Sequence, residues 1–163
     1  MDFGLRQQKY LEMAGQGGAI CELGCGLSPF LSEAKKKFTL AFGVDFSPHT
    51  INEARRLFPK VDYVLSDVIK TPLPDKMFDV VVAGEVIEHM EDPKKLVDEM
   101  VRLAKHKLVL STPMLEFNDL EHLWEFTEDS LKDLLAPYGQ VTTEVVSSSR
   151  FIGRKYIFAC VEL

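Results

Sequence analysis

The stretch that decides the fold reads Ile20-Cys21-Glu22-Leu23-Gly24-Cys25-Gly26-Leu27-Ser28. It follows an apolar run over residues 19–23, which predicts a strand, and leads into Ser28-Pro29, an N-cap residue followed by a proline that suits the first helical position. Open parallel sheets bind ligands at such strand-to-helix turns, where glycines let the backbone pass close to the ligand. We therefore expect a doubly wound α/β fold with a ligand site at Gly24 and Gly26.

Outward from this turn, the chain alternates between strand and helix patterns. Strands are expected over residues 40–45, 61–65, 78–83 and 107–111, and helices over residues 28–38, 47–58, 92–104 and 127–139. Pro72 and Pro74 prevent a full helix over residues 68–76, so we expect a crossover loop there. Residues 141–147 and 156–161 predict two final strands joined around Gly153. This order predicts a mostly parallel sheet that ends in an antiparallel C-terminal hairpin.

Length and composition narrow the class of protein further. A chain of 163 residues with 46% hydrophobic and 27% charged residues predicts one globular domain over residues 1–163. The longest apolar runs are only strand-sized, so we expect no membrane partner. Three cysteines, without a second metal-ligand pair, favour a reduced cytoplasmic setting. A net charge of −6 disfavours a broad nucleic-acid surface.

The glycine loop differs from a dinucleotide-binding loop. The pattern G-x-G-x-x-G, counted from Gly24, requires a third glycine where this chain has Pro29. In its place, Glu22 stands two positions before the first glycine, at the end of the expected strand. This pattern resembles motif I of the class I S-adenosylmethionine-dependent methyltransferases, with Ser28 at the usual third glycine. The resemblance implies a Rossmann-like methyltransferase fold with S-adenosylmethionine as cofactor.

Two more carboxylates follow the next two expected strands. Asp45 ends the second strand, where a carboxylate can bind both hydroxyls of a ribose. Asp67 follows the third strand, and in the resembled family a carboxylate there lies beside the adenine amino group. Cys25 is expected to allow close backbone approach to the cofactor rather than to act as a nucleophile. The full set of expected cofactor contacts is Glu22, Gly24, Cys25, Gly26, Asp45, Phe46, Asp67, Val68, Ala83 and Glu85.

The segment from Phe78 to Met90 resembles motif IV of the same superfamily, and its Glu88-His89 pair is common in the quinone-biosynthesis branch, which belongs with the type 11 methyltransferases. The resemblance runs from about residue 18 to residue 139. If Glu85 opens a helical turn, Glu88 and His89 share its face at i+3 and i+4. For a hydroxyl acceptor, His89 is the expected catalytic base, because the unperturbed pKa of histidine lies near neutrality.

The second half also resembles the small-RNA 3′-terminal 2′-O-methyltransferases, through residues 85–89, 111–113, 116–118 and 121–127. That resemblance implies a divalent cation held by Glu85, Glu88, His89 and His122. Mixed oxygen and nitrogen ligands suit manganese, iron or zinc, and magnesium less well. The alternative is a metal-free pocket that Glu88 and His89 cap or line. An RNA acceptor is disfavoured, because the chain is acidic and lacks a basic stripe with interleaved aromatics.

The expected activity is therefore methyl transfer to an unidentified small-molecule hydroxyl or amine. One alternative is a non-catalytic or partner-dependent S-adenosylmethionine-binding subunit, since few residues remain to enclose a substrate. A partner chain, or a second copy in a homodimer, could complete the pocket. The other alternative is a nicotinamide-dependent oxidoreductase, which Pro29 and the absence of a Tyr-x-x-x-Lys pair at a strand end disfavour.

Overall fold

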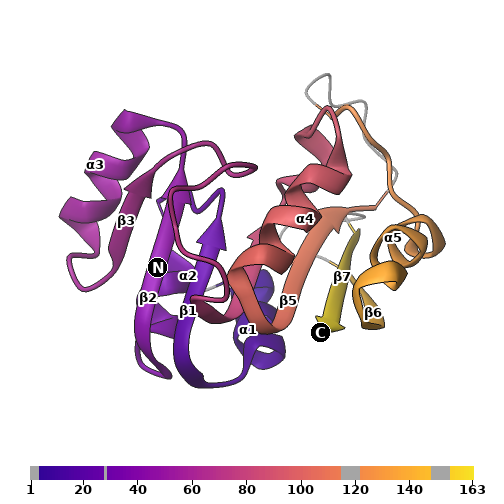
Figure 1. The fold of residues 1–163 in the computed structure, drawn as a ribbon, viewed down its shortest axis with the longest axis horizontal. Coiled ribbons are helices and arrows are strands. Elements are labelled where there is room, and N and C mark those ends of the chain that lie inside the picture. Colours follow the sequence, from indigo (N-terminus) through magenta and orange to yellow (C-terminus); the bar gives the residue numbers. More distant parts are fainter. Residues whose placement is uncertain (1–3, 28, 115–121, 148–154) are drawn as a thin grey trace.

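A computed structural model describes residues 4–27, 29–114, 122–147 and 155–163 of the chain (Figure 1). The strands are β1 (Gly17–Leu23), β2 (Phe38–Asp45), β3 (Asp62–Leu65), β4 (Phe78–Gly84), β5 (Ala104–Pro113), β6 (Gln140–Ser147) and β7 (Lys155–Glu162). The α-helices are α1 (Leu5–Ala14), α2 (Pro29–Ala34), α3 (Pro48–Leu57), α4 (Pro93–Leu103) and α5 (Glu128–Leu135), and the 3-10 turns are η1 (Ile87–His89) and η2 (Ala136–Tyr138).

All seven strands belong to one sheet, in the order β3-β2-β1-β4-β5-β7-β6. The neighbours from β3 to β5 pair in parallel, whereas β7 runs antiparallel to both β5 and β6. The prediction of a mostly parallel sheet with an antiparallel C-terminal hairpin is confirmed. The expected joint around Gly153 lies outside the described residues.

The sheet is covered on both faces, which explains the unbroken apolar run in β4. Successive strand side chains point to opposite faces, so Val81 and Ala83 join one core, whereas Val80 and Val82 join the other. The first core contains buried aliphatic residues of α4 and α5, and the second contains the buried residues of α1, α2 and α3. Figure 1 shows α4 crossing one face of the sheet. Helices on both faces are what a doubly wound fold requires.

Three of the predicted helix starts carry the expected caps. The side chain of Ser47 accepts a hydrogen bond from the Thr50 amide at 3.3 Å, and that of Asp92 accepts one from the Lys94 amide at 3.1 Å. Thr127 and Ser130 form a reciprocal capping box. Side-chain caps satisfy amides that the first helical turn leaves unpaired. The fourth expected cap, Ser28, lies outside the described residues.

Three features of the fold differ from the sequence predictions. Helix α1 was not expected, because its N-cap Gly4 offers no side-chain cap and only Tyr10 and Ala14 of the helix are buried. Phe38 begins β2 instead of extending the first helix, because α2 ends at Ala34. Strand β5 begins at Ala104, immediately after α4, and is longer than the predicted strand over residues 107–111.

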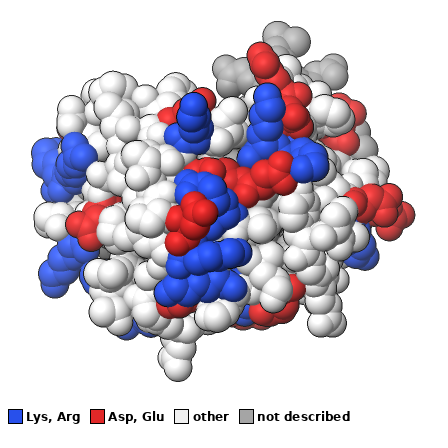
Figure 2. Space-filling model, viewed as in Figure 1, with Lys and Arg blue, Asp and Glu red and all other residues white. Residues whose placement is uncertain are grey.

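The face of the molecule in Figure 2 mixes the two signs of charge. Basic and acidic side chains lie next to one another there, and no contiguous basic stripe crosses this face. The exposed ion pair between Lys94 and Asp98 is one example in this chain of neighbouring charges of opposite sign. Among the helices that the structure describes, none is long and apolar enough to span a membrane.

Candidate cofactor and catalytic site

The glycine loop after β1 is fixed against the end of β2. The amides of Gly24 and Cys25 both donate to the carbonyl of Val44, at 2.8 and 3.0 Å. Gly24 and Gly26 have φ values of +70° and +53°, in the left-handed region that favours glycine. A Cβ atom on Gly24 would collide with the side chain of Val86, whereas one on Gly26 would meet nothing within 4 Å. The space over Gly26 is therefore open to a ligand.

Asp45 joins this loop to the next strand-to-helix turn. The residue is 8% exposed, and its carboxylate accepts two hydrogen bonds, from the Gly26 amide to Oδ2 at 3.0 Å and from the Ser47 amide to Oδ1 at 2.9 Å. Each carboxylate oxygen can accept a further hydrogen bond, so a fixed pair of acceptors remains for a diol. The neighbouring Phe46 is 78% exposed. The arrangement fits the ribose of a nucleoside ligand.

The expected adenine contacts lie on the loop after β3. Asp67 is exposed, and its Oδ1 accepts a hydrogen bond from the Ile69 amide at 3.1 Å. This contact holds a local turn and leaves the second carboxylate oxygen for a ligand. Val68 is buried in the core that faces α4, as is Ala83 at the end of β4. Their side chains pack in this core, so only their backbone atoms are available to contact a cofactor.

A cavity of about 150 Å³ opens beside Gly24, at the carboxyl ends of β1 and β4. The parts of the chain around it are α1, the glycine loop, the start of α2 and the end of β4. Its lining consists of Arg6, Gln7, Tyr10, Glu22, Gly24, Cys25, Pro29, Phe30, Gly84 and Glu85. The three residues from α1 were missed from the sequence because the helix itself was missed. The turn glycine Gly15, with φ +74°, was the available signal for the end of that helix.

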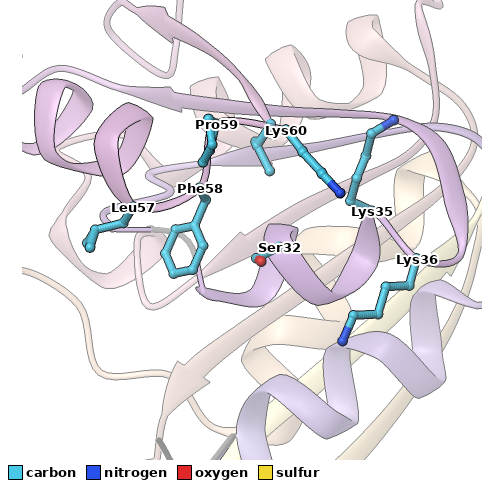
Figure 3. Close-up of a pocket in the computed structure, with 8 residues that line it drawn as sticks. Ser32, Lys35, Lys36, Leu57, Phe58, Pro59 and Lys60 are labelled. Atoms are coloured by element: carbon cyan, nitrogen blue, oxygen red, sulfur yellow. The ribbon is translucent and has the colours of Figure 1, made fainter.

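A larger cavity, of about 320 Å³, lies at the other end of the strands (Figure 3). It is lined by Ser32, Lys35, Lys36, Leu57, Phe58, Pro59, Lys60 and Val61. These residues precede β2 and β3, whereas ligands of open α/β sheets bind beyond the carboxyl ends of the strands. This lining holds no carboxylate, imidazole or thiol. The smaller cavity is therefore the candidate cofactor site.

Cys25 is placed where its thiol cannot serve as a nucleophile. The side chain is 6% exposed and packs toward Gly43. Burial raises the pKa of the Cys25 thiol far above its usual range, and the nearby carboxylates of Glu22 and Asp45 raise it further. The thiol stays protonated at neutral pH, so the residue has a structural role in the loop.

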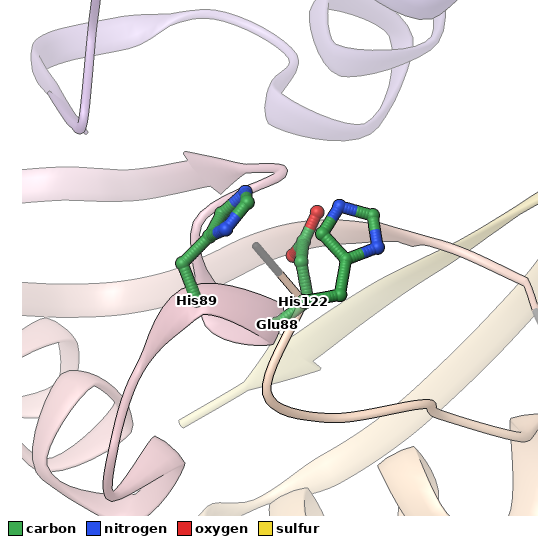
Figure 4. Close-up of side chains that lie close together, drawn as sticks. All are labelled: Glu88, His89 and His122. Atoms are coloured by element: carbon green, nitrogen blue, oxygen red, sulfur yellow. The ribbon is translucent and has the colours of Figure 1, made fainter. Parts of the chain in front are cut away.

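Glu88, His89 and His122 come together beyond the end of β4 (Figure 4). One ligand atom from each side chain lies within 4.8 Å of the other two. The carbonyl of Glu88 accepts hydrogen bonds from the Leu123 amide at 2.8 Å and the Trp124 amide at 3.2 Å. These backbone contacts hold the segment that carries His122 against η1. Tertiary contacts between two separate segments therefore bring the three side chains together.

Glu88 is 1% exposed, and neither of its carboxylate oxygens has a hydrogen-bond partner of good geometry among the described residues. Burial raises the pKa of Glu88, whereas its own backbone amide, the charge of His89 and the nearby Thr112 hydroxyl act in the opposite direction. Buried carboxylates are costly unless they are paired, hydrogen-bonded or bound to a metal. An unsatisfied carboxylate beside two imidazoles therefore fits a cation of the type expected from the sequence.

Glu85 does not open a helical turn with Glu88 and His89, and the expected shared helical face is wrong. Its φ of +56° lies in the left-handed region, and the 3-10 turn η1 begins only at Ile87. The carboxylate of Glu85 instead forms an ion pair with Arg6 of α1 and lines the cofactor cavity. It therefore stands apart from the group formed by Glu88, His89 and His122.

The family described as "Methyltransferase domain" matches residues 21–110 of this chain. The match begins in β1 and ends in β5, so it includes the glycine loop, Asp45, Asp67 and the Glu88-His89 pair. The chain belongs to this family, within the class I S-adenosylmethionine-dependent methyltransferase superfamily.

The names of individual relatives refer to different methyl acceptors. The chain is 32% identical over 92 residues to ajmaline N-methyltransferase of Rauvolfia serpentina, covering 52% of this chain and 32% of that protein. It is 30% identical over 95 residues to a probable chloroplastic tocopherol O-methyltransferase of Oryza sativa subsp. japonica. That match covers 53% of this chain and 26% of that protein. The matches thus span about a third or less of these relatives.

Among solved structures, the fold is similar to magnesium protoporphyrin IX methyltransferase from Synechocystis PCC 6803 with bound SAH. The TM-score is 0.78 at 18% sequence identity, and the alignment covers 97% of this chain and 84% of that one. At this identity the likeness concerns the fold, which is that of a Rossmann-like methyltransferase.

Proposed function

We propose that this chain transfers a methyl group from S-adenosylmethionine to a small-molecule hydroxyl or amine. The observation that carries the proposal is the hydrogen bond from the Gly26 amide to Asp45. It joins an open glycine loop to a buried carboxylate at the carboxyl ends of adjacent parallel strands. Membership of the methyltransferase domain family supports the same cofactor.

The described residues suggest a placement for each part of the cofactor. The methionine end lies over Gly24 and Gly26, beside the smaller cavity. The ribose hydroxyls meet the carboxylate of Asp45, and the adenine lies beside Asp67. The exposed ring of Phe46 offers an apolar surface next to the ribose.

When bound, the cofactor supplies an electrophilic methyl group on a sulfonium. The transfer is an in-line displacement, so the residues of the chain have to align the acceptor and exclude water. A hydroxyl acceptor must also lose its proton. His89, exposed just beyond β4, can accept that proton at an imidazole nitrogen. An amine that arrives unprotonated needs less help from a base.

Calorimetry with S-adenosylhomocysteine, followed by a methyl-transfer screen, tests the proposal. The screen covers catechols, quinone precursors, amines, RNA ends and peptide pools, with and without divalent cations. Binding together with turnover of a small acceptor supports the proposal. Binding without turnover of any acceptor favours the alternative of a partner-dependent cofactor-binding subunit, whereas tight binding of NAD instead favours an oxidoreductase.

We propose further that Glu88, His89 and His122 bind a divalent cation. The unsatisfied buried carboxylate and the two neighbouring imidazoles support it, and their mixed ligand set suits manganese, zinc or iron better than magnesium. A cation there would lower the pKa of a bound hydroxyl acceptor. His89 would then serve as a ligand, so its roles as ligand and as base are alternatives that metal analysis distinguishes.

A further inference from the structure

The larger cavity, at the amino ends of β2 and β3, has a lining that is partly apolar and partly basic (Figure 3). Its apolar side chains belong to the end of α3 and to the turn before β3, and they are Leu57, Phe58, Pro59 and Val61. Three ammonium groups and one hydroxyl complete the lining, from Lys35, Lys36, Lys60 and Ser32. The volume of about 320 Å³ lies near the lower end of the range of about 300 to 1,000 Å³ that is usual for ligand pockets, so the cavity suits a small ligand.

Backbone hydrogen bonds fix both walls of this cavity. On one side, helix α2 ends at Ala34, whose carbonyl accepts the Lys37 amide at 2.8 Å. On the other side, the Val61 amide donates to the Phe58 carbonyl at 3.1 Å and closes the turn before β3. Val61 is buried, and Phe58 packs against the core that contains the buried residues of α2 and α3. The cavity therefore exists before a ligand binds, so binding does not have to order its walls.

The three ammonium groups are only partly compensated by negative charge. Lys36 forms an ion pair with Glu33 at 2.6 Å, whereas Lys35 donates to the neutral carbonyl of Thr39. Lys60 is exposed and forms no ion pair within the part of the chain that the structure describes. Figure 3 shows the Lys60 side chain extending from its turn toward the segment that carries Lys35. Two positive charges beside an apolar surface thus remain available to an anion.

We propose that this cavity binds a small organic anion. Its apolar body lies against Leu57 and Phe58, and its carboxylate or phosphate group meets the ammonium groups of Lys35 and Lys60. Leu57 is 43% exposed, so a ligand there removes apolar surface from water. The ammonium groups supply charge-assisted hydrogen bonds that a neutral ligand of the same shape cannot use.

This site is separate from the one proposed for the cofactor. The cofactor loops follow the carboxyl ends of β1, β2 and β3, whereas the lining of this cavity precedes β2 and β3. The two ligands therefore do not compete for the same residues. The proposal also does not depend on methyl transfer, because it rests on the shape and charge of this cavity alone.

Calorimetry with three probes tests the proposal on wild-type protein. 1-Naphthoate has both an apolar body and a charge, 1-naphthamide has the same rings without the charge, and inorganic phosphate has the charge without the rings. 1-Naphthoate should bind roughly fivefold or more tightly than 1-naphthamide, which is the scale of an exposed ion pair. 1-Naphthyl phosphate should bind too, and at least roughly tenfold more tightly than inorganic phosphate, because only the former buries apolar surface. The tighter of the two naphthyl anions identifies the preferred anionic group.

Variants of the lysines locate the bound anion. Lys60→Met should lose roughly threefold to fivefold in affinity for 1-naphthoate and keep its affinity for 1-naphthamide, whereas Lys60→Arg should retain both. Combining Lys60→Met with Lys35→Met should bring the loss to roughly tenfold or more. Lys95→Met is the matched control, because Lys95 is an exposed lysine of α4, a helix that packs in the core on the other face of the sheet.

Equal affinity of wild-type protein for 1-naphthoate and 1-naphthamide would overturn the proposal, and so would a failure to bind 1-naphthoate. Neither result depends on the folding of a variant. Unchanged affinity in the double lysine variant would also overturn it, since the anion would then lie elsewhere. The same holds if S-adenosylhomocysteine displaces 1-naphthoate completely, because the probe would then occupy the cofactor site.

Discussion

The imidazole rings of His89 and His122 lie 4.9 Å apart between centroids and meet at 71°. One ring follows β4 and the other precedes α5, so no local periodicity relates them. The carbonyl of Glu88 joins the two segments by accepting the amides of Leu123 and Trp124. The indole nitrogen of Trp124 adds a hydrogen bond to the carbonyl of Met90 at 2.9 Å. These contacts hold the two segments together, so that the two imidazoles lie side by side.

Replacing Asp45 with alanine should weaken binding of S-adenosylhomocysteine by more than roughly tenfold, because two charge-assisted contacts to the ribose are lost. The variant also frees the Gly26 and Ser47 amides, so a general loosening of the loop must be separated from loss of the ribose contact. A 2′-deoxy analogue of the ligand does so: wild type should discriminate against it, and Asp45→Ala should not. Asp62→Asn, at an exposed carboxylate that begins β3, is the matched control.

Asp67→Ala should lower affinity for the adenine ring and leave the fold intact, because Asp67 is exposed on a loop. Its hydrogen bond to the Ile69 amide is local and its loss is small beside the stability of the domain. The measurement compares S-adenosylhomocysteine with the inosine analogue, in which a carbonyl replaces the amino group. Wild type should prefer adenine. A variant that keeps this preference would show that Asp67 only forms the turn.

Most helices and strands could be predicted because the sequence signals that mark them are local. Ser47, Asp92 and Thr127 mark helix starts by their own side chains, and the apolar run in β4 follows from burial on both faces. Helix α1 gives no such signal. It lacks a side-chain cap and buries only two residues, so its position depends on tertiary contacts such as that between Tyr10 and Ser111.

The candidate site was predictable only in part, for a related reason. Gly24, Gly26 and Asp45 lie at strand ends, and the parallel sheet brings such ends together whatever the details of packing. Glu85 was misplaced because helical spacing was assumed at a residue with positive φ, and Arg6 was missed because its helix was missed. Both residues depend on how α1 packs against the sheet, which no short sequence pattern encodes.

The stability of the protein should depend on pH through Asp79. This β4 carboxylate accepts hydrogen bonds from the Ala19 and Gly18 amides, each at 2.8 Å, and these contacts lower its pKa below the usual value. Because the pKa of Asp79 is lower in the folded state than in the unfolded state, its charge stabilises the fold above about pH 4. This stabilisation is lost as the pH falls further.

Asp79→Asn should therefore lower the free energy of unfolding by about 1 kcal/mol at pH 7, the usual scale for hydrogen bonds to a charged group that is partly exposed. Urea denaturation at pH 7 and at pH 3 measures the effect, and the difference from wild type should shrink at the lower pH. Asp62→Asn again serves as control. A difference of the same size at both values of pH would mean that the charge of Asp79 contributes nothing.

Without a cation, Glu88 is a buried carboxylate beside the imidazoles of His89 and His122. A buried carboxylate with no hydrogen bond of good geometry among the described residues destabilises the fold, and a cation that binds only the folded protein removes that penalty. Manganese or zinc at about one hundred times its dissociation constant should add about 2.7 kcal/mol to the free energy of unfolding. For a chain of this size, that corresponds to a rise of roughly 5 to 10 °C in Tm.

His122→Ala should abolish this gain, and it is the informative variant because His122 lies on a different segment from Glu88 and His89. His49→Ala, at an exposed histidine on α3, should keep it and controls for metal bound nonspecifically by imidazoles. Glu88→Gln should also lose the gain, because an amide binds these cations weakly, and should make the metal-free protein no less stable than wild type. The cation proposal is wrong if elemental analysis finds no stoichiometric metal and if neither cations nor EDTA change Tm. Glu88, His89 and His122 would then only line a pocket. His89 would then act as a base without a metal.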